Sequence, residues 1–471
     1  MKRVLIITYY FPPSGGAGVQ RVLKFVKYMR EFGWEPVVYT AEGAAYPILD
    51  PTLEKDIPEG IKIYRHKIWE PYEWYKKFTG QKKEETVYSG FISENKKISP
   101  TQKLSIWIRG NFFIPDARCF WIKPSVKFFV DELKKNPVDA MISSGPPHTT
   151  HMIALGVKRK LNIPWLADFR DPWTNIDFYD QLMLTRWADA KHKHMEKQVL
   201  MSADAIDTVS WHWAEDFQKL SGRKIEVVTN GFDEEDFPEK TPEKIGASGT
   251  GQLGNSEMSK SPVTLSEVEG FASAYASTPL SMTSQKFVIA HVGSLNKDRN
   301  HSSLWEALKE LCEEQKEFRE KLVIQLIGKN DFSVYQLIEK NQLTQNLQRI
   351  DYLPHNEVGA YQRRASVLYL PINNTPNALG IVPGKLFEYL AARRPILIVG
   401  TEDGDSARIV REAKAGVVCG IDDKTKIKNE ISKMFALWKE GNLKVDAKGV
   451  EQYSRKKIAG KIADLLNGIV K

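Results

Sequence analysis

The chain has 471 residues, of which 42% are hydrophobic and 27% charged, and its formal net charge is +8 at pH 7. This length exceeds the usual size of one domain, and the composition is that of an ordinary globular protein, so two domains are expected. The three cysteines are widely spaced, which argues against a disulfide framework or a zinc site and fits a reducing compartment. No stretch reaches the apolar length that spans a bilayer, and the N-terminal apolar run is too short for a signal peptide, so we expect a cytoplasmic protein.

The positive charge is modest for a chain of this length. A basic surface would suit anionic lipid headgroups or a phosphorylated substrate. The sequence contains no arginine-rich or aromatic-interleaved motif of the kind that binds nucleic acid. We therefore expect no nucleic-acid partner, and we expect either a phosphorylated substrate or a peripheral contact with an anionic membrane.

The first half of the chain alternates between predicted strands and helices. An apolar run at residues 2–10 is followed by a helical pattern that ends at Gly33, and by a helix over 148–161 further along. Short strands separated by helices predict a parallel, doubly wound sheet. The further strands are expected within 35–41, 60–67, 138–145, 164–171 and 203–210.

Two segments depart from this alternation. Residues 71–125 carry many aromatic side chains beside lysines, and they form either a helical excursion that caps the core or an element that faces an acceptor or a membrane surface. Residues 244–285 are dominated by small and polar residues without periodicity, which predicts a disordered insertion near a domain junction. We assign that insertion no chemistry.

The strand and helix alternation restarts after the insertion, with strands expected within 286–295, 321–330, 365–372, 394–400 and 415–420. The fold class predicted for the chain is α/β, with two Rossmann-like, doubly wound parallel-sheet domains that face each other across a cleft. The predicted boundaries are an acceptor-side domain at 1–225, a linker at 226–285, a nucleotide-sugar domain at 286–445 and a C-terminal helix at 446–471 that packs back on the first domain.

A glycine-rich turn, YYFPPSGGAGVQR, separates the first strand from the first helix. It matches neither the P-loop pattern nor the G-x-G-x-x-G fingerprint. Its glycines, Gly15, Gly16 and Gly18, would let a ligand approach backbone N–H groups at a helix start. The pattern fits a tight strand-to-helix turn equally well.

Two further motifs follow strands of the first half. In SSGPPHTTH, His148 stands at a helix start beside the carboxyl end of a strand, where ligands bind in such sheets, whereas His151 is one helical turn further on. In ADFRDPW, Asp171 could face acceptor hydroxyls, or Arg170 could form an internal ion pair that shapes the loop. We favour His148 as a functional residue and leave the second motif open.

The second half offers a set of charges suited to a diphosphate. Arg299 follows a strand, and Lys385 lies at the start of a helix behind a glycine-rich turn, so both can neutralise phosphate charge. Glu388, one turn into an otherwise apolar helix, needs a partner such as a sugar hydroxyl. The pair Asp403 and Asp405 could bind a divalent metal, but Asp405 precedes a helix and is expected to be its N-cap, so no metal is predicted.

Together these motifs resemble the retaining glycosyltransferases of the GT-B fold, family 4 type. In that family a glycine-rich loop after the first strand approaches the donor phosphates, which Gly15 and Gly16 match, and a histidine near the transferred sugar is matched by His148. A pair of glutamates lies eight positions apart, and Glu388 matches the second, which holds the donor ribose. The backbone that frames the base is matched by residues 352–354.

The sequence departs from the family pattern at two positions. Ser294 stands where the family has an arginine, with Arg299 at the place of the following lysine, and Lys385 is a substitute cation. Gly380 stands where the first glutamate contacts the donor sugar. The resemblance implies transfer of a hexose or amino-hexose from a nucleoside-diphosphate sugar to a hydroxyl of a glycan or lipid-linked acceptor, with retained anomeric configuration and without metal or other cofactor.

Two alternatives remain open at this point. One is a sugar-nucleotide epimerase of the same fold. The other is a catalytically silent partner that binds a glycan or a second transferase.

Overall fold

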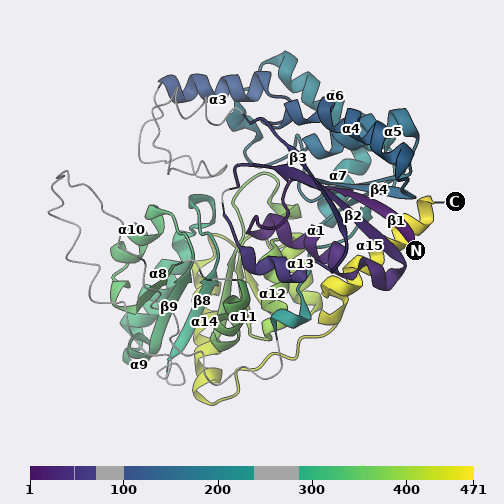
Figure 1. Ribbon diagram of the computed structural model, residues 1–471. Helices are drawn as coiled ribbons and strands as arrows, with labels where there is room; N and C mark the ends of the chain where they lie inside the picture. The colour runs from purple at the N-terminus through teal and green to yellow at the C-terminus, as the bar shows by residue number, and fades with distance from the viewer. Residues whose placement is uncertain (47, 71–99, 238–285, 352, 354, 471) are drawn as a thin grey trace, which may run out of the picture.

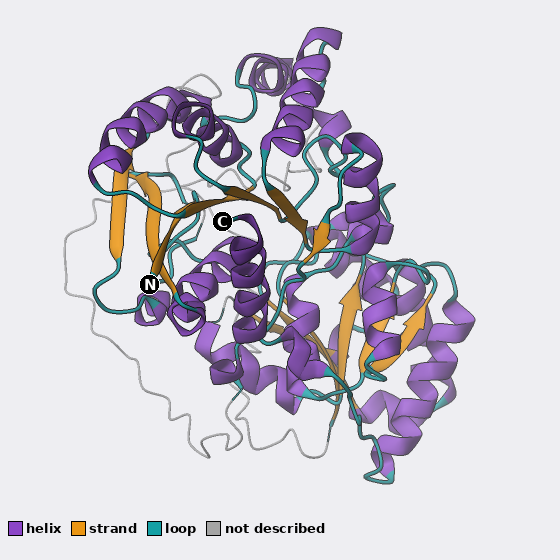
Figure 2. Cartoon of the chain, turned by 90° about the vertical axis from the view of Figure 1, so that its right-hand side faces the viewer, coloured by secondary structure: helices purple, strands orange, loops and turns teal. Residues whose placement is uncertain are grey.

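The computed structural model describes residues 1–46, 48–70, 100–237, 286–351, 353 and 355–470 (Figure 1). The predicted insertion at 244–285, the part of the aromatic segment at 71–99, and residues 352 and 354 of the base-framing stretch lie outside the described residues. Within the described residues the chain forms two parallel sheets, each flanked by helices (Figure 2). The predicted fold class is confirmed.

The first sheet has seven strands in the order β3-β2-β1-β4-β5-β6-β7, all parallel. Its central strands are continuous apolar runs because helices cover both of their faces. The strands are β1 (Lys2–Ile7), β2 (Trp34–Glu42), β3 (Lys62–Lys67), β4 (Ala140–Gly145), β5 (Trp165–Phe169), β6 (Ala205–Thr208) and β7 (Glu226–Val227). Strand β7 was not predicted, because two residues carry no readable pattern.

The helices of this domain follow the expected alternation. The first one continues as a short 3-10 turn, Met29–Phe32, and stops at Gly33, whose φ of 81° lies in the left-handed region that glycine adopts without strain. The helices are α1 (Ala17–Tyr28), α3 (Pro100–Phe112), α4 (Ile122–Lys135), α5 (Thr149–Leu161), α6 (Arg186–Ser202) and α7 (Trp211–Ser221).

The second sheet has six parallel strands in the order β10-β9-β8-β11-β12-β13. Its strands are β8 (Phe287–Val292), β9 (Leu322–Ile327), β10 (Leu347–Ile350), β11 (Val367–Pro371), β12 (Ile396–Val399) and β13 (Gly416–Cys419). Its helices are α8 (Ser302–Glu314), α9 (Lys316–Lys321), α10 (Phe332–Lys340), α11 (His355–Arg364), α12 (Gly384–Ala392), α13 (Asp405–Glu412) and α14 (Lys424–Lys439). Strand β10 was not predicted, since its sequence LQRI alternates apolar and polar residues over only four positions.

The last helix, α15 (Arg455–Ile469), returns to the first domain and packs against α1, so that both chain ends lie on the same side of the molecule (Figure 1). Its apolar residues Ile458, Ile462 and Leu466 are fully buried in the same core as the first strand. The chain crosses between the domains where the backbone N–H of Phe232 donates to Tyr453 and that of Arg455 donates to Phe232.

No helix among the described residues is long and apolar enough to cross a membrane.

Candidate functional site

Each sheet reverses its strand order between two strands whose following loops contain predicted site residues. In the first sheet the reversal lies between β1 and β4, and in the second it lies between β8 and β11. Ligands of open parallel sheets bind at such switch points, outside the carboxyl ends of the strands. The loops that leave these four strands contain the glycine-rich turn, the turn before His148, Arg299 and the segment that leads into α12.

The two paired glycines of the glycine-rich turn, Gly15 and Gly16, have different backbone environments. The N–H of Gly15 donates to the carbonyl of Ile48 at 2.9 Å, and a Cβ on Gly15 would lie 2.9 Å from Cβ of Asp50. Gly16 precedes α1 with a φ of 86°, which disfavours any other residue. The N–H of Gly15 is therefore engaged within the loop, and the part of the loop that can meet a ligand begins at Gly16, where the positive end of the helix dipole lies.

Arg170, at the end of β5, joins this turn to the loop after β4. Its guanidinium donates to the carbonyl oxygen of Gly18 at 2.5 Å, to that of Gly145 at 3.3 Å, and to that of Pro146. Burial lowers the pKa of Arg170, and the nearby carboxylates of Asp168 and Asp171 oppose this effect. The side chain thus shapes two loops through carbonyl oxygens, rather than through a close ion pair.

A buried charge network fixes α1 above the sheet. Arg21 lies 2.9 Å from the carboxylate of Asp168 and 2.8 Å from that of Asp207, with all three side chains 1% exposed or less. The hydroxyl of Ser144 also donates to Asp168 at 2.6 Å. Because the arginine is one turn inside the helix, the start of α1 is held in register with the carboxyl ends of β4, β5 and β6.

His148 precedes the first residue of α5 and is 7% exposed. Its ring stacks on the indole of Trp173, with 4.5 Å between the centroids and 2° between the planes, and its Nδ1 has no hydrogen-bond partner among the described residues. Burial holds the pKa of His148 well below its usual range, and the nearby His151, His192 and Arg170 lower it further. The imidazole is therefore neutral near pH 7 and can donate or accept a hydrogen bond.

His151 has a different environment. It is fully buried, and its Nδ1 lies 2.8 Å from the hydroxyl of Ser143. Its Nε2 is so close to Gly145 that a Cβ built on that glycine would lie 2.5 Å from it. Burial lowers its pKa to about 3. These contacts make His151 a core residue, and they leave His148 as the histidine at the lip of the sheet.

In the second domain the ammonium of Lys385 lies behind the turn that follows β8. It lies 3.3 Å from Nε2 of His291 and 2.8 Å from the position of a Cβ on Gly293, whose φ is 105°. Burial and the positive charge of Arg299 lower the pKa of Lys385 to about 7, although the carboxylate of Glu388 opposes them. The structure thus brings the three residues predicted for this domain into one electrostatic neighbourhood.

Arg299 faces the first domain as well as the second. Its Nε donates to the amide oxygen of Asn373, whose amide nitrogen donates to Asp177 of the first domain at 3.0 Å. Burial lowers the pKa of Arg299, and the carboxylates of Asp177 and Asp298 raise it. Burial also raises the pKa of Asp171, which interacts with the charges of Arg170 and Asp177. Asp177 is therefore near enough to act electrostatically on both Asp171 and Arg299, and it reaches the second domain through Asn373.

Glu388 accepts a hydrogen bond from the amide of Gln362 at 2.9 Å, so its partner in this structure comes from α11. The side chain of Arg455, the first residue of α15, is only 7% exposed. Its Nη1 has no hydrogen-bond partner among the described residues. Burial lowers the pKa of Arg455 to about 10, and Glu388 is among the carboxylates that raise it. Sequence reasoning missed Arg455, because a basic residue in the lysine-rich tail gives no signal of burial.

Sequence reasoning also missed the roles of Asp177, Asn373 and Gln362. Polar residues in loops and on helix surfaces are common, and only the folded arrangement brings these three to the charged residues above. Asp405 was predicted to cap α13, and this was wrong. Gly404 is the N-cap, and the carboxylate of Asp405 instead accepts hydrogen bonds from the backbone N–H of His212 at 2.9 Å and pairs with its Nδ1 at 2.8 Å.

One group of carboxylates, Asp56, Asp233 and Glu235, is close enough to share a metal ion within the described residues. Lys24 and Lys27 already lie among them, with nitrogen–oxygen distances of 2.5 to 3.1 Å. The two ammonium groups compensate the carboxylate charge, and this cluster ties α1 to the segment that leaves the first domain.

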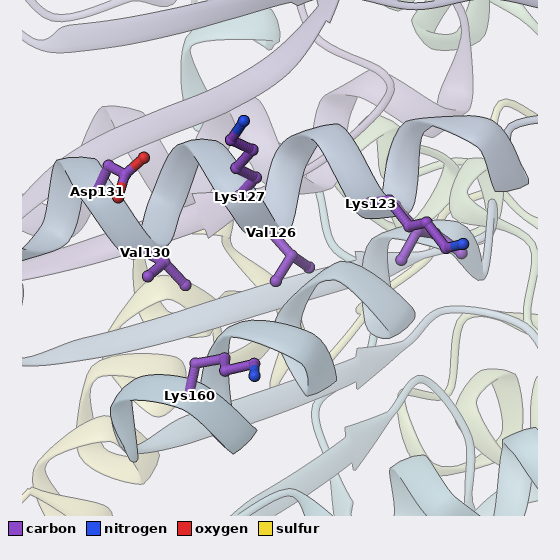
Figure 3. A pocket seen from close by; sticks show the side chains of 7 residues that line it. Lys123, Val126, Lys127, Val130, Asp131 and Lys160 are labelled. Carbon is purple, nitrogen blue, oxygen red and sulfur yellow. The ribbon is translucent and has the colours of Figure 1, made fainter.

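An open groove lies on the outer side of the first domain, between α4 and α5 (Figure 3). It is lined by the apolar side chains Ile122, Val126 and Val130 and by Lys123, Lys127, Asp131 and Lys160. The groove is formed by helices rather than by the loops at the switch points, so it is separate from the charged site described above.

Residues 279–448 match the family model "Glycosyl transferases group 1". Among solved structures, the chain resembles sucrose-phosphate synthase from Thermosynechococcus elongatus, with a TM-score of 0.59, 13% identity and 99% of each chain covered. It resembles HepE from Anabaena, solved in complex with UDP, with a TM-score of 0.59, 11% identity, and 99% of this chain and 100% of that one covered.

A third similar structure is WaaG, described as a glycosyltransferase involved in lipopolysaccharide biosynthesis, with a TM-score of 0.53, 13% identity, and 99% of this chain and 100% of that one covered. No curated protein shows a significant sequence match. At these identities the structural likenesses establish the fold alone, and the family model matches only the second domain. The chain thus has the GT-B fold, and its second domain matches the model of glycosyl transferases group 1.

Proposed function

We propose that the protein transfers a hexose from a nucleoside-diphosphate sugar to a hydroxyl of a glycan or lipid-linked acceptor, with retention of the anomeric configuration, in cell-surface polysaccharide assembly. The observation that carries the proposal is the convergence of Arg299, Lys385 and Glu388 at the switch point of the domain that matches the glycosyl transferases group 1 model. One cation at the start of α12 and a second in the turn after β8 suit a diphosphate, and a carboxylate one turn into α12 suits a ribose diol.

The chemical difficulty of the proposed reaction is departure of the nucleoside diphosphate from a carbon that becomes oxocarbenium-like. Arg299, Lys385 and the N-terminus of α12 would stabilise the negative charge that develops on the leaving phosphate, and they are preorganised in a partly buried site where such interactions are stronger than in water. This set of positive groups is the basis for proposing a reaction that needs no metal ion.

In the first domain, His148 is the residue placed to contact the transferred sugar. Its neutral imidazole suits a hydrogen bond to a sugar hydroxyl. We assign Asp171, whose pKa is raised by burial, to the acceptor side. We propose a front-face mechanism in which the leaving phosphate oxygen takes the proton of the acceptor hydroxyl, so that the bond to the acceptor forms on the face from which the diphosphate departs.

The first domain also presents a surface suited to an anionic bilayer. Phe112 and Phe120 are exposed, and the indole of Trp69 contacts Phe120 with 4.9 Å between the centroids. Two residues after Phe120 along the chain, Ile122 begins the lining of the groove, which carries Lys123 and Lys127 (Figure 3). Exposed aromatic rings next to lysines favour the interface of an anionic membrane, so we propose a cytoplasmic protein that contacts the membrane peripherally and meets a lipid-linked acceptor there.

Titration with UDP, GDP and ADP by calorimetry tests the donor site. One of the three nucleotides is expected to bind the full-length chain, and the Lys385→Met variant is expected to bind it at least tenfold more weakly. Equal affinity of the two proteins would contradict the placement of the diphosphate. Sedimentation with vesicles of phosphatidylglycerol, compared with phosphatidylcholine, tests the membrane contact, and equal binding to both would contradict it.

A further inference from the structure

Three consecutive residues at the start of α7 bind the second domain. His212 makes the two hydrogen bonds to Asp405 described above. The guanidinium of Arg408 lies over the ring of Trp211, 4.3 Å from its centroid. Trp213, the third residue, contacts Gly380. Helix α7 therefore docks on two elements of the second domain, α13 and the short 3-10 turn Ala378–Gly380.

The contact between Trp213 and Gly380 leaves no space for a side chain at position 380. A Cβ on Gly380 would lie 2.2 Å from Cδ1, 2.3 Å from Nε1 and 2.8 Å from Cγ of the indole. Trp213 is 6% exposed and belongs to the core of the first domain. Because the indole is rigid and packed in that core, even a methyl group at 380 would force the domains apart or displace the ring.

This contact lies between the two halves of the candidate site. Gly380 is followed by Ile381, which packs against the cores of both domains, and then by the start of α12 with Lys385. On the other side, the ring of Phe217 in the same helix α7 contacts the ring of Phe169, with 4.9 Å between the centroids. The centroid of Phe169 lies 6.2 Å from that of the His148 ring. Helix α7 thus connects the histidine of the first domain with the segment of the second that leads into α12 and Lys385.

The indole of Trp213 is positioned at a cost to folding. Its Nε1 is buried and has no hydrogen-bond partner among the described residues. A buried donor without a partner destabilises the folded state.

We propose that Trp213 is a positioning residue that, seated on Gly380, sets the distance between His148 and the cations of the second domain. The inference rests on the proposed function for its consequence in catalysis, because closure of a cleft excludes water and completes a site. Gly380 is then required by the fit of the two domains, and the indole fills the space that a side chain at this position would take.

The test is the Gly380→Ala variant of the full-length chain, with Gly468→Ala as the matched control. Position 468 lies in α15, and a Cβ there meets nothing within 4 Å. The rate of backbone amide hydrogen exchange is expected to rise at least tenfold in residues 211–221 and 378–384 of Gly380→Ala. In the control the rate should stay unchanged. Unchanged exchange in both segments would overturn the proposal, whether or not the protein transfers sugar.

A double substitution separates a clash from general damage. The shorter side chain of Trp213→Leu removes the ring that the methyl group would strike, so the pair Gly380→Ala and Trp213→Leu is expected to restore the exchange of residues 378–384 to the level of Trp213→Leu alone. If a donor is turned over, kcat/KM of Gly380→Ala falls at least tenfold and the double variant recovers to the level of Trp213→Leu. Additive effects of the two substitutions would contradict direct coupling.

If no donor is turned over by the unmodified protein while Gly380→Ala still raises exchange, the proposed function fails and the domain contact stands. If donor is turned over and Gly380→Ala changes neither exchange nor kcat/KM, the positioning role fails and the proposed function stands.

Discussion

The guanidinium of Arg170 donates a hydrogen bond to the carbonyl oxygen of Gly18 at 2.5 Å, and so a residue at the end of β5 holds the glycine-rich turn that follows β1. The same side chain binds the carbonyls of Gly145 and Pro146, in the turn before His148. The two loops of the first domain that face the candidate site are therefore positioned by one cation.

This arrangement predicts that Arg170→Ala lowers kcat/KM by about 10- to 100-fold, because small displacements of groups that position a substrate reduce rates by such factors. Arg170→Lys retains the charge but cannot reach three carbonyls with a planar fork, so it is expected to rescue little. Steady-state kinetics on the donor that the unmodified protein uses gives the measurement. Full activity of Arg170→Lys would show that charge alone suffices.

The second prediction concerns the leaving group. Arg299→Ala and Lys385→Ala are each expected to lower kcat by about 100-fold, since removal of one preorganised group that stabilises transition-state charge has effects of this size. Lys461, an exposed lysine on α15, provides the control, and Lys461→Ala should leave kcat unchanged. Retention of full activity in Arg299→Ala would remove that residue from the diphosphate site.

The third prediction follows from the pKa of Lys385, which burial lowers to about 7. A bound diphosphate adds negative charge and raises that pKa, so the complex binds a proton that the free site releases. Nucleotide affinity therefore falls by up to tenfold per pH unit as the pH rises above 7, until the pKa of Lys385 in the complex is passed. Calorimetry in buffers of different ionisation enthalpy should detect proton uptake at pH 8, and uptake should vanish in Lys385→Met.

The fourth prediction concerns acid stability. His151 is buried as the neutral form, with its pKa lowered to about 3, whereas in the unfolded chain the pKa is about 6.5. Its contribution to stability is present above pH 6.5 and is lost as the pH falls from 6.5 toward 3, by about 1.4 kcal/mol per pH unit. Urea unfolding at pH 7.5, 6 and 5 should show a shallower pH dependence for His151→Phe than for the unmodified chain. Parallel curves would contradict this.

The fold could be predicted from the sequence because its signals are local. Short, mostly apolar runs such as residues 286–295, bounded by turn residues, are typical of strands buried on both faces of a parallel sheet, and Gly33 marks a helix end through its own backbone preference. The positions of Lys385 and Arg299 followed in turn, because charged residues behind parallel strands gather at one edge of the sheet.

What the sequence could not predict are contacts between the domains. Trp213 reads as an ordinary apolar position of an amphipathic helix, and Gly380 as a turn residue, until the fold places one on the other. Asp405 fits the pattern of an N-cap and instead pairs with His212 from the first domain. Such pairings depend on the relative placement of two domains, which no local pattern encodes.

The most direct test of the account is release of nucleoside diphosphate from a panel of UDP-, GDP- and ADP-sugars, measured with and without a lipid-linked glycan acceptor. The account predicts release from one donor that accelerates when the acceptor is present, and loss of this activity in Lys385→Met. Absence of release from every donor, with the chain folded and with or without acceptor, would contradict it.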